Sequence, residues 1–276
     1  MEDEQIEGCN GFYARHTLKR FLDAQSRLKR SRLALYPLPA HLWLDHIRCV
    51  GLETLDVALE RRDISVSSFH PQSFQYSLFE GTKTSQGRWT AAYYRRCVDT
   101  AAALGCSTLC IEPAGSLLDR SPQEQWRNLV EQVAGLCAYA RQHGVQVCVQ
   151  TVTRAESGLL RTLEELLRLL EEVPDACAVL DTVPASQAGE SISLWFSALG
   201  EKIRHVRFRD GRTDGGRIWG EGVYPFHSYG AQLLEVPYTG TVSLCGVTDR
   251  YQDRPEEADT INLARAQGLL YTASGG

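Results

Sequence analysis

The chain has 276 residues, of which 43% are hydrophobic, and a formal net charge of −5 at pH 7. This length and hydrophobic content suit one α/β barrel or two ordinary domains, and no break in composition favours two. The acidic balance gives no general attraction to a phosphate backbone, so we expect no nucleic-acid partner.

The sequence also argues against a membrane protein. It contains no apolar run long enough to span a bilayer, and its first residues, Met-Glu-Asp-Glu, carry the wrong charge for a secretory leader. We therefore expect a cytoplasmic protein. The nine cysteines include no Cys-x-x-Cys pair, which predicts reduced thiols that pack as small hydrophobic side chains.

Helix and strand patterns alternate along the whole chain. The basic stretch at residues 19–32 interleaves Lys and Arg with apolar residues at helical spacing, which indicates an amphipathic helix with a solvated basic face. Further on, Ser121-Pro-Gln-Glu124 is a capping box that opens a helix, and Gly144 ends it. The expected strands are one within residues 6–13, then 32–36, 64–70, 107–112, 145–150, 177–181, 203–209 and 240–245. The expected helices are 18–29, 52–61, 89–104, 122–143, 159–172, 190–199, 226–234 and 255–270.

Such alternation calls for a parallel sheet with right-handed crossovers. Eight strands predict an α/β fold of the (β/α)8 TIM barrel type, formed as a single domain by residues 1–276. The alternative is a doubly wound open sheet. No Gly-x-Gly-x-x-Gly turn follows an early strand, which counts against a dinucleotide-binding form of that alternative.

Four of the expected strands carry a polar residue at or near the C-terminal end: Gln150, Asp181, Arg207 and Ser243. Strand ends converge on the functional face of a barrel, yet only Asp181 is an acid suited to hold a cation. Because Asp181 and Arg207 would otherwise be uncompensated charges, we expect them to form an ion pair. His205 lies two residues before Arg207, so both side chains should lie on the same face of their strand.

From about residue 70 onward the chain resembles the xylose isomerase-like TIM barrels, in particular sugar epimerases of the fructoselysine 3-epimerase and tagatose 3-epimerase type. The resemblance rests on colinear pieces, namely residues 69–78, 134–140, 153–157, 180–181, 199–206, 220–222 and 241–244. It implies a divalent cation, often manganese, held by Glu, Asp, His and Glu at the ends of strands five to eight. It further implies that the two glutamates move a proton beside the substrate carbonyl.

This chain departs from that ligand set at three of the four positions. Gln150, Arg207 and Ser243 stand where the resemblance implies glutamate, histidine and glutamate, and Asp181 alone is retained. A guanidinium cannot ligate a cation, and an amide or hydroxyl is a poor ligand and no useful base. We therefore expect no bound metal and no other cofactor. His205 is expected to support the site, with a rescued metal ligand as the alternative.

The candidate catalytic residues are then Glu156, Arg207 and Asp181. Candidates for substrate binding are the side chains at or near strand ends: Gln150, Ser243, His205, Glu112 and Glu221. Glu156 matches a carboxylate that the resemblance places against the substrate, although a plain acid at a helix N-terminus is an equal interpretation. Glu112 has a solvated loop acid as its equal alternative, and Glu221, between two glycines, is more often a turn residue.

Two hypotheses about function follow. The first is a sugar isomerase or epimerase that acts on a ketose, sugar phosphate or sugar adduct, with Arg207 in place of the metal. The second is a catalytically inactive barrel, or pseudoenzyme, that binds a sugar-like ligand or partners an active paralogue. A homo-oligomer is the alternative to a complex with such a paralogue. A metal-dependent abasic-site endonuclease would need several metals and a basic groove, which this sequence lacks.

Overall fold

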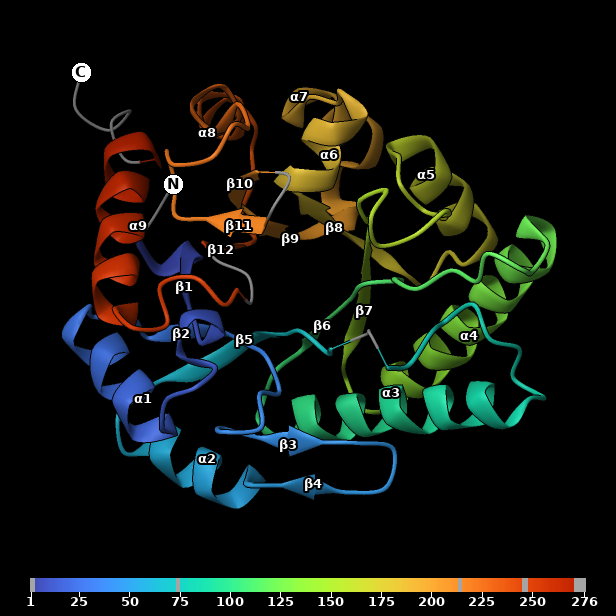
Figure 1. Ribbon diagram of the computed structural model, residues 1–276, viewed down its shortest axis with the longest axis horizontal. Coiled ribbons are helices and arrows are strands. Elements are labelled where there is room, and N and C mark those ends of the chain that lie inside the picture. Colours follow the sequence, from blue (N-terminus) through green and yellow to red (C-terminus); the bar gives the residue numbers. More distant parts are fainter. Residues whose placement is uncertain (1–2, 73–74, 213–214, 245–247, 271–276) are drawn as a thin grey trace.

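The computed structural model describes residues 3–72, 75–212, 215–244 and 248–270. Within these residues, strands close into a parallel barrel in the order β1-β12-β9-β8-β7-β6-β5-β2, and helices surround the ring (Figure 1). The barrel strands are β1 (Ile6–Cys9), β2 (Arg32–Leu35), β5 (Ser65–Phe69), β6 (Thr108–Ile111), β7 (Gln146–Gln150), β8 (Cys177–Asp181), β9 (Ile203–Arg207) and β12 (Thr241–Ser243). The predicted (β/α)8 barrel is confirmed. The open sheet is wrong, because β1 pairs in parallel with both β12 and β2.

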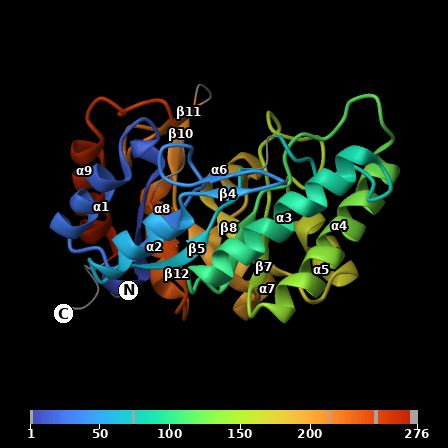
Figure 2. The same ribbon diagram turned by 90° about the horizontal axis from the view of Figure 1, so that it is seen from below.

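The helices follow the strands as expected, with one addition. They are α1 (Leu18–Arg27), α2 (Leu52–Glu60), α3 (Ser85–Ala103), α4 (Pro122–Gln142), α5 (Leu163–Glu172), α6 (Thr182–Ala188), α7 (Ile192–Leu199), α8 (Phe226–Glu235) and α9 (Pro255–Leu270). The Ser121 hydroxyl accepts the Glu124 backbone N–H at 3.1 Å, which confirms the predicted start of α4. Helices α3 and α4 lie side by side in both views (Figures 1 and 2). None of the described helices is long and apolar enough to cross a membrane.

The departures from prediction lie in the loops above the barrel. Two short antiparallel hairpins, β3 (Trp43–Leu44) with β4 (Cys49–Val50) and β10 (Asp210–Arg212) with β11 (Gly215–Arg217), follow β2 and β9. Their strands are too short to show an alternating pattern. Helix α6 was also not predicted, because it begins directly at the end of β8 without a loop. The strand expected at 240–245 is described only as β12, and Cys245 lies outside the described residues.

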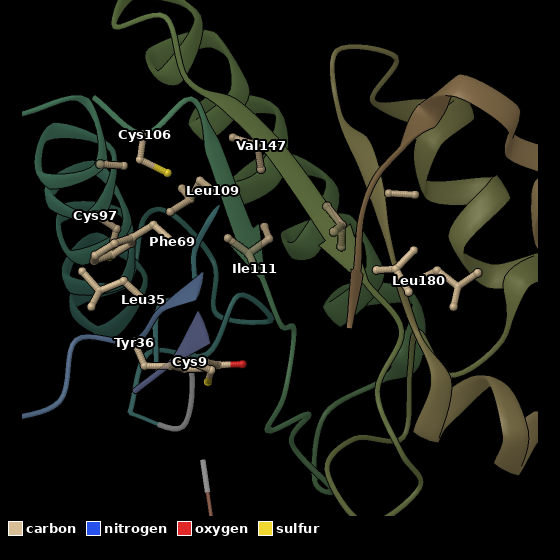
Figure 3. Close-up of a cluster of buried hydrophobic side chains, with 14 of the residues drawn as sticks. Cys9, Leu35, Tyr36, Phe69, Cys97, Cys106, Leu109, Ile111, Val147 and Leu180 are labelled. Atoms are coloured by element: carbon tan, nitrogen blue, oxygen red, sulfur yellow. The ribbon is translucent and has the colours of Figure 1, made fainter. Parts of the chain in front are cut away.

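Most of the hydrophobic core lies between the barrel strands and the surrounding helices. Figure 3 shows part of it, where Leu35, Phe69 and Leu109 from neighbouring strands lie near Cys97 of α3. Seven described cysteines are free thiols, six of them buried, as predicted: Cys49, Cys97, Cys106, Cys110, Cys137, Cys148 and Cys177. Cys9 is disulfide-bonded, so the prediction of reduced thiols is wrong there.

One half-buried acid outside the barrel mouth should make stability depend on pH. Asp259 of α9 accepts a 2.8 Å hydrogen bond from Gln25 of α1, and burial raises its pKa from 3.8 to about 7. The folded state therefore binds this proton more tightly than the unfolded state does. The free energy of unfolding should fall as pH rises from about 4 to about 7.

We expect Asp259→Asn to remove this part of the pH dependence. A pKa difference of this size corresponds to ~4 kcal/mol, and partial contact with water reduces the expected effect to on the order of 2 kcal/mol. Urea unfolding at both ends of the pH range measures it. Asp253→Asn is the control, because the Asp253 side chain is 79% exposed. Equal pH slopes in wild type and Asp259→Asn would contradict the assignment.

Candidate functional site

The carboxyl ends of β7, β8, β9 and β12 bring the four polar strand-end residues together. Asp181 and Ser243 each lie in register with Arg207, on the two sides of β9. The Arg207 Nη1 atom lies 3.4 Å from Asp181 Oδ2, and both side chains are almost fully buried. The predicted ion pair is therefore confirmed.

Arg207 is the centre of this group. Its Nη1 atom donates to Gln150 Oε1 at 2.6 Å and to Glu112 Oε2 at 2.9 Å, so one guanidinium joins the ends of β6, β7 and β8. Its buried Nε has no hydrogen-bond partner within the described residues. Burial works to lower the pKa of Arg207, but Asp181 and Glu112 help to hold it well above the usual value. The guanidinium therefore stays charged.

Arg209, just beyond β9, contacts Asp181 more closely than Arg207 does. Its Nη2 and Nε atoms donate to the two oxygens of Asp181 at 2.5 Å and 3.0 Å. The Asp181 carboxylate also accepts the backbone N–H of Val183 at 3.0 Å and so caps α6. Sequence reasoning missed Arg209, although its place two residues after Arg207 on the expected strand was a signal that both point the same way.

These contacts decide whether the strand ends fit a divalent cation. Both oxygens of Asp181 accept N–H donors from Arg209, and the Gln150 carbonyl oxygen accepts one from Arg207. The Ser243 hydroxyl hydrogen-bonds to His205. A guanidinium already supplies the positive charge that a carboxylate here requires. The residues at these four positions therefore do not fit the divalent cation implied by the resemblance.

A second polar layer lies below, inside the barrel. The two ring nitrogens of His205 lie 2.9 Å from the hydroxyls of Thr241 and Ser243, so His205 is held by its neighbours on β12. Burial and then the charge of Arg207 lower its pKa to about 3, which keeps the imidazole neutral. Nearby, Glu7 of β1 is fully buried, and burial raises its pKa.

Hydroxyl groups connect Glu7 to a second histidine. The Ser67 and Ser68 hydroxyls donate to the two oxygens of Glu7 at 2.6 Å and 2.7 Å, and Ser68 also lies 2.8 Å from His70 Nε2. The His70 ring stacks on Tyr36 with centroids 4.9 Å apart. Sequence reasoning missed Glu7, Tyr36 and His70. Glu7 lies in the first strand, whose bounds were only loosely predicted, whereas Tyr36 and His70 lie at the ends of strands that were predicted closely and carried no signal of a shared site.

Of the remaining candidate residues, Glu112 contacts the strand-end group, whereas Glu156 and Glu221 make other contacts. Glu112 joins through Arg207, and its side chain is 26% exposed. The Glu156 carboxylate accepts the Thr153 backbone N–H at 2.7 Å within the loop after β7. The exposed Glu221 accepts the Tyr251 hydroxyl at 2.8 Å. The structure thus gives both acids local contacts, and their catalytic and substrate-binding roles stay predictions.

The Gly-Glu-Gly turn has a structural explanation. The Asp210 carboxylate accepts the backbone N–H groups of Gly220 and Gly222 at 2.8 Å and 2.9 Å. A Cβ atom at Gly222 would lie 1.8 Å from Asp210 Oδ1, so only glycine fits there. This motif fixes the loop beside the β10–β11 hairpin.

The arrangement is a charge-balanced cluster of two guanidiniums and two carboxylates at the mouth of a barrel. Arg209 and Glu112 are its solvent-accessible members, with side chains 21% and 26% exposed, while Arg207 and Asp181 form the buried floor. Guanidinium donors and carboxylate acceptors side by side suit a ligand rich in hydroxyl groups.

Comparisons with known proteins agree with the barrel fold. The model of the family described as xylose isomerase-like TIM barrel matches residues 23–266. Fructoselysine 3-epimerase from Shigella flexneri is 22% identical over 236 residues, which cover 83% of this chain and 85% of that protein. The IOLI protein, solved with a binding zinc atom, superposes with a TM-score of 0.80 at 16% identity and covers 99% of this chain and all of its own. D-psicose 3-epimerase from Clostridium cellulolyticum H10, solved with D-tagatose, has a TM-score of 0.75 at 16% identity, over 96% of this chain and 99% of its own.

Proposed function

Because the chain belongs to the xylose isomerase-like TIM barrel family, we propose that it binds a ketose or another sugar-derived ligand at the carboxyl ends of its strands, with Arg207 in place of a divalent cation. The observation that carries the proposal is that the Asp181 carboxylate forms ion pairs with two arginines, Arg207 and Arg209. A cation could reach this carboxylate only by displacing the bidentate Arg209, and it would then lie against two positive charges.

The same contacts favour binding over turnover. Proton transfer beside a carbonyl needs an acid or base that is free to contact the substrate. Asp181 is held by Arg207 and Arg209, and Glu156 is held within its own loop. Gln150 and Ser243 cannot move the proton. We therefore propose a sugar-binding barrel without the metal-dependent chemistry implied by the resemblance. Association with an active paralogue or a second copy stays a prediction.

One observation supports an isomerase or epimerase as the second candidate. Glu112 is a partly exposed carboxylate 2.9 Å from Arg207 Nη1. In this alternative, Glu112 would remove the proton beside the substrate carbonyl, and Arg207 would stabilise the negative charge that develops on the carbonyl oxygen. To remove that proton, Glu112 would first have to leave its hydrogen bond with Arg207, which is why we place this candidate second.

A panel of ketoses and sugar adducts, including D-psicose, D-tagatose and fructoselysine, tests the proposal. We expect at least one compound to raise the melting temperature of chelator-treated protein, and added manganese to leave that shift unchanged. The same mixtures in deuterated water separate the two candidates. A binding protein incorporates no deuterium into the sugar, whereas an epimerase incorporates it beside the carbonyl. Stabilisation that requires manganese would contradict the proposal.

A further inference from the structure

Beneath the strand-end cluster lies a group of buried side chains suited to hold a soft metal ion. We propose that His70, Cys110 and His205 form a zinc site on the inside of the barrel. One ligand atom from each of the three lies within 4.8 Å of the other two, and all three residues are buried. The site is distinct from the strand-end positions, because it uses none of Gln150, Asp181, Arg207 or Ser243 as a required ligand.

The ligand set selects the metal. Two imidazoles and one thiolate are ligands for zinc, whereas manganese and magnesium prefer oxygen. Zinc binds nitrogen at about 2.0–2.1 Å and sulfur at about 2.3 Å, so the three ligand atoms must move inward by about 1 Å. His70 follows β5, Cys110 lies in β6 and His205 in β9, so the ion would tie two neighbouring strands to one across the barrel.

His70 provides an independent sign of a missing partner. Its Nδ1 atom is buried and has no hydrogen-bond partner within the described residues. Ser68 donates its proton to Glu7, so it accepts one from His70 Nε2, which leaves the lone pair on Nδ1. A buried polar atom without a partner requires an explanation, and an ion bound to Nδ1 supplies one.

Glu7 is linked to both imidazoles through hydroxyl groups. It accepts from Ser68, which bonds to His70, and Thr241 contacts both Glu7 and His205 Nδ1. Metal-binding histidines are usually oriented in this way by a carboxylate or hydroxyl on their second nitrogen. His205 Nε2 is then the ligand atom, and the Ser243 hydroxyl, 2.9 Å from it, is the nearest group for a fourth position.

Charge and protons also balance. Zinc would replace the thiol proton of Cys110, and that proton would leave to solvent. The thiolate and the Glu7 carboxylate together offset the two positive charges of the ion. Arg207 is close to both histidines, but Asp181 and Glu112 neutralise its charge.

Cobalt replacement tests the site without any activity assay. Protein purified without chelator is expected to carry about one zinc ion per chain, and apoprotein titrated with cobalt should show thiolate-to-cobalt charge-transfer absorption in the near ultraviolet. Cys110→Ser and His70→Gln should each reduce bound zinc to near zero. Cys148→Ser is the matched control, because Cys148 is equally buried and lies in register with Cys110 on the neighbouring strand.

Asp181→Asn separates this site from a cation at the strand ends, and it should keep the zinc. Circular dichroism of each variant verifies the fold. If Cys110→Ser fails to fold, the cobalt spectrum of the wild type and the His70→Gln variant still decide the matter. Wild-type protein that takes up neither zinc nor cobalt, or cobalt absorption that persists in Cys110→Ser, would overturn the proposal. The proposal would also be overturned if Asp181→Asn lost its zinc while Cys110→Ser and His70→Gln kept theirs.

Discussion

Replacing Asp181 by alanine is expected to lower the free energy of unfolding by about 3–5 kcal/mol, because it leaves buried positive charge without a partner. Asp181 is fully buried and is the carboxylate that Arg207 and Arg209 share. Its removal also takes the N-terminal cap from α6, since the carboxylate accepts the Val183 N–H. Urea unfolding at neutral pH measures the loss.

A surface ion pair provides the control. Asp175 lies 3.2 Å from Arg141, and their side chains are 58% and 72% exposed. Exposed pairs contribute about 0–1 kcal/mol, so Asp175→Ala should change stability little. If Asp181→Ala were as mild as Asp175→Ala, the buried cluster would not depend on its carboxylate, and our account of the strand ends would be wrong.

Replacing Arg207 by methionine is expected to weaken binding of the sugar ligand by about 10-fold to 100-fold, because a hydrogen bond to a charged group typically contributes about 1.5–3 kcal/mol. The fold should survive. Asp181 keeps both hydrogen bonds to Arg209, and the partly exposed Glu112 can turn to water. Titration calorimetry with the ligand found in the sugar panel measures the affinity.

Arg141→Met is the matched control for this second prediction. It removes a guanidinium from the exposed ion pair between Arg141 and Asp175, and it should leave the affinity for the sugar ligand unchanged. Unchanged affinity in Arg207→Met would show that the ligand does not depend on this guanidinium, and it would leave Arg209 and Glu112 as the groups to test.

The barrel could be predicted because its signals are local. Cys177–Asp181 and Pro255–Leu270 match the expected bounds to the residue, since apolar runs and terminal signals mark them directly. Helix α3 begins at Ser85 instead of residue 89, because the Thr84 hydroxyl caps it by accepting the Gly87 N–H. The hairpin strands in the loops are held by pairing across the hairpin, which a single stretch of sequence does not reveal.

Contacts within the site could be predicted only between residues that the order of the strands brings together. Asp181 and Arg207 end neighbouring strands, so their contact followed from the fold. Arg209 was missed although the expected strand includes it, because β9 ends at Arg207 and the bidentate contact depends on the backbone beyond that end. Glu7 was missed because its role depends on Ser67 and Ser68, some sixty residues away in the chain.

The most direct test of the central claim is a crystal of the protein soaked in manganese, with anomalous scattering recorded at the manganese edge. The claim is that a guanidinium, and not a metal ion, holds the Asp181 carboxylate at the barrel mouth. We predict no anomalous peak within bonding distance of Asp181, with Arg209 still bound to both carboxylate oxygens. A manganese ion bound to Asp181, with Arg209 displaced, would contradict the claim.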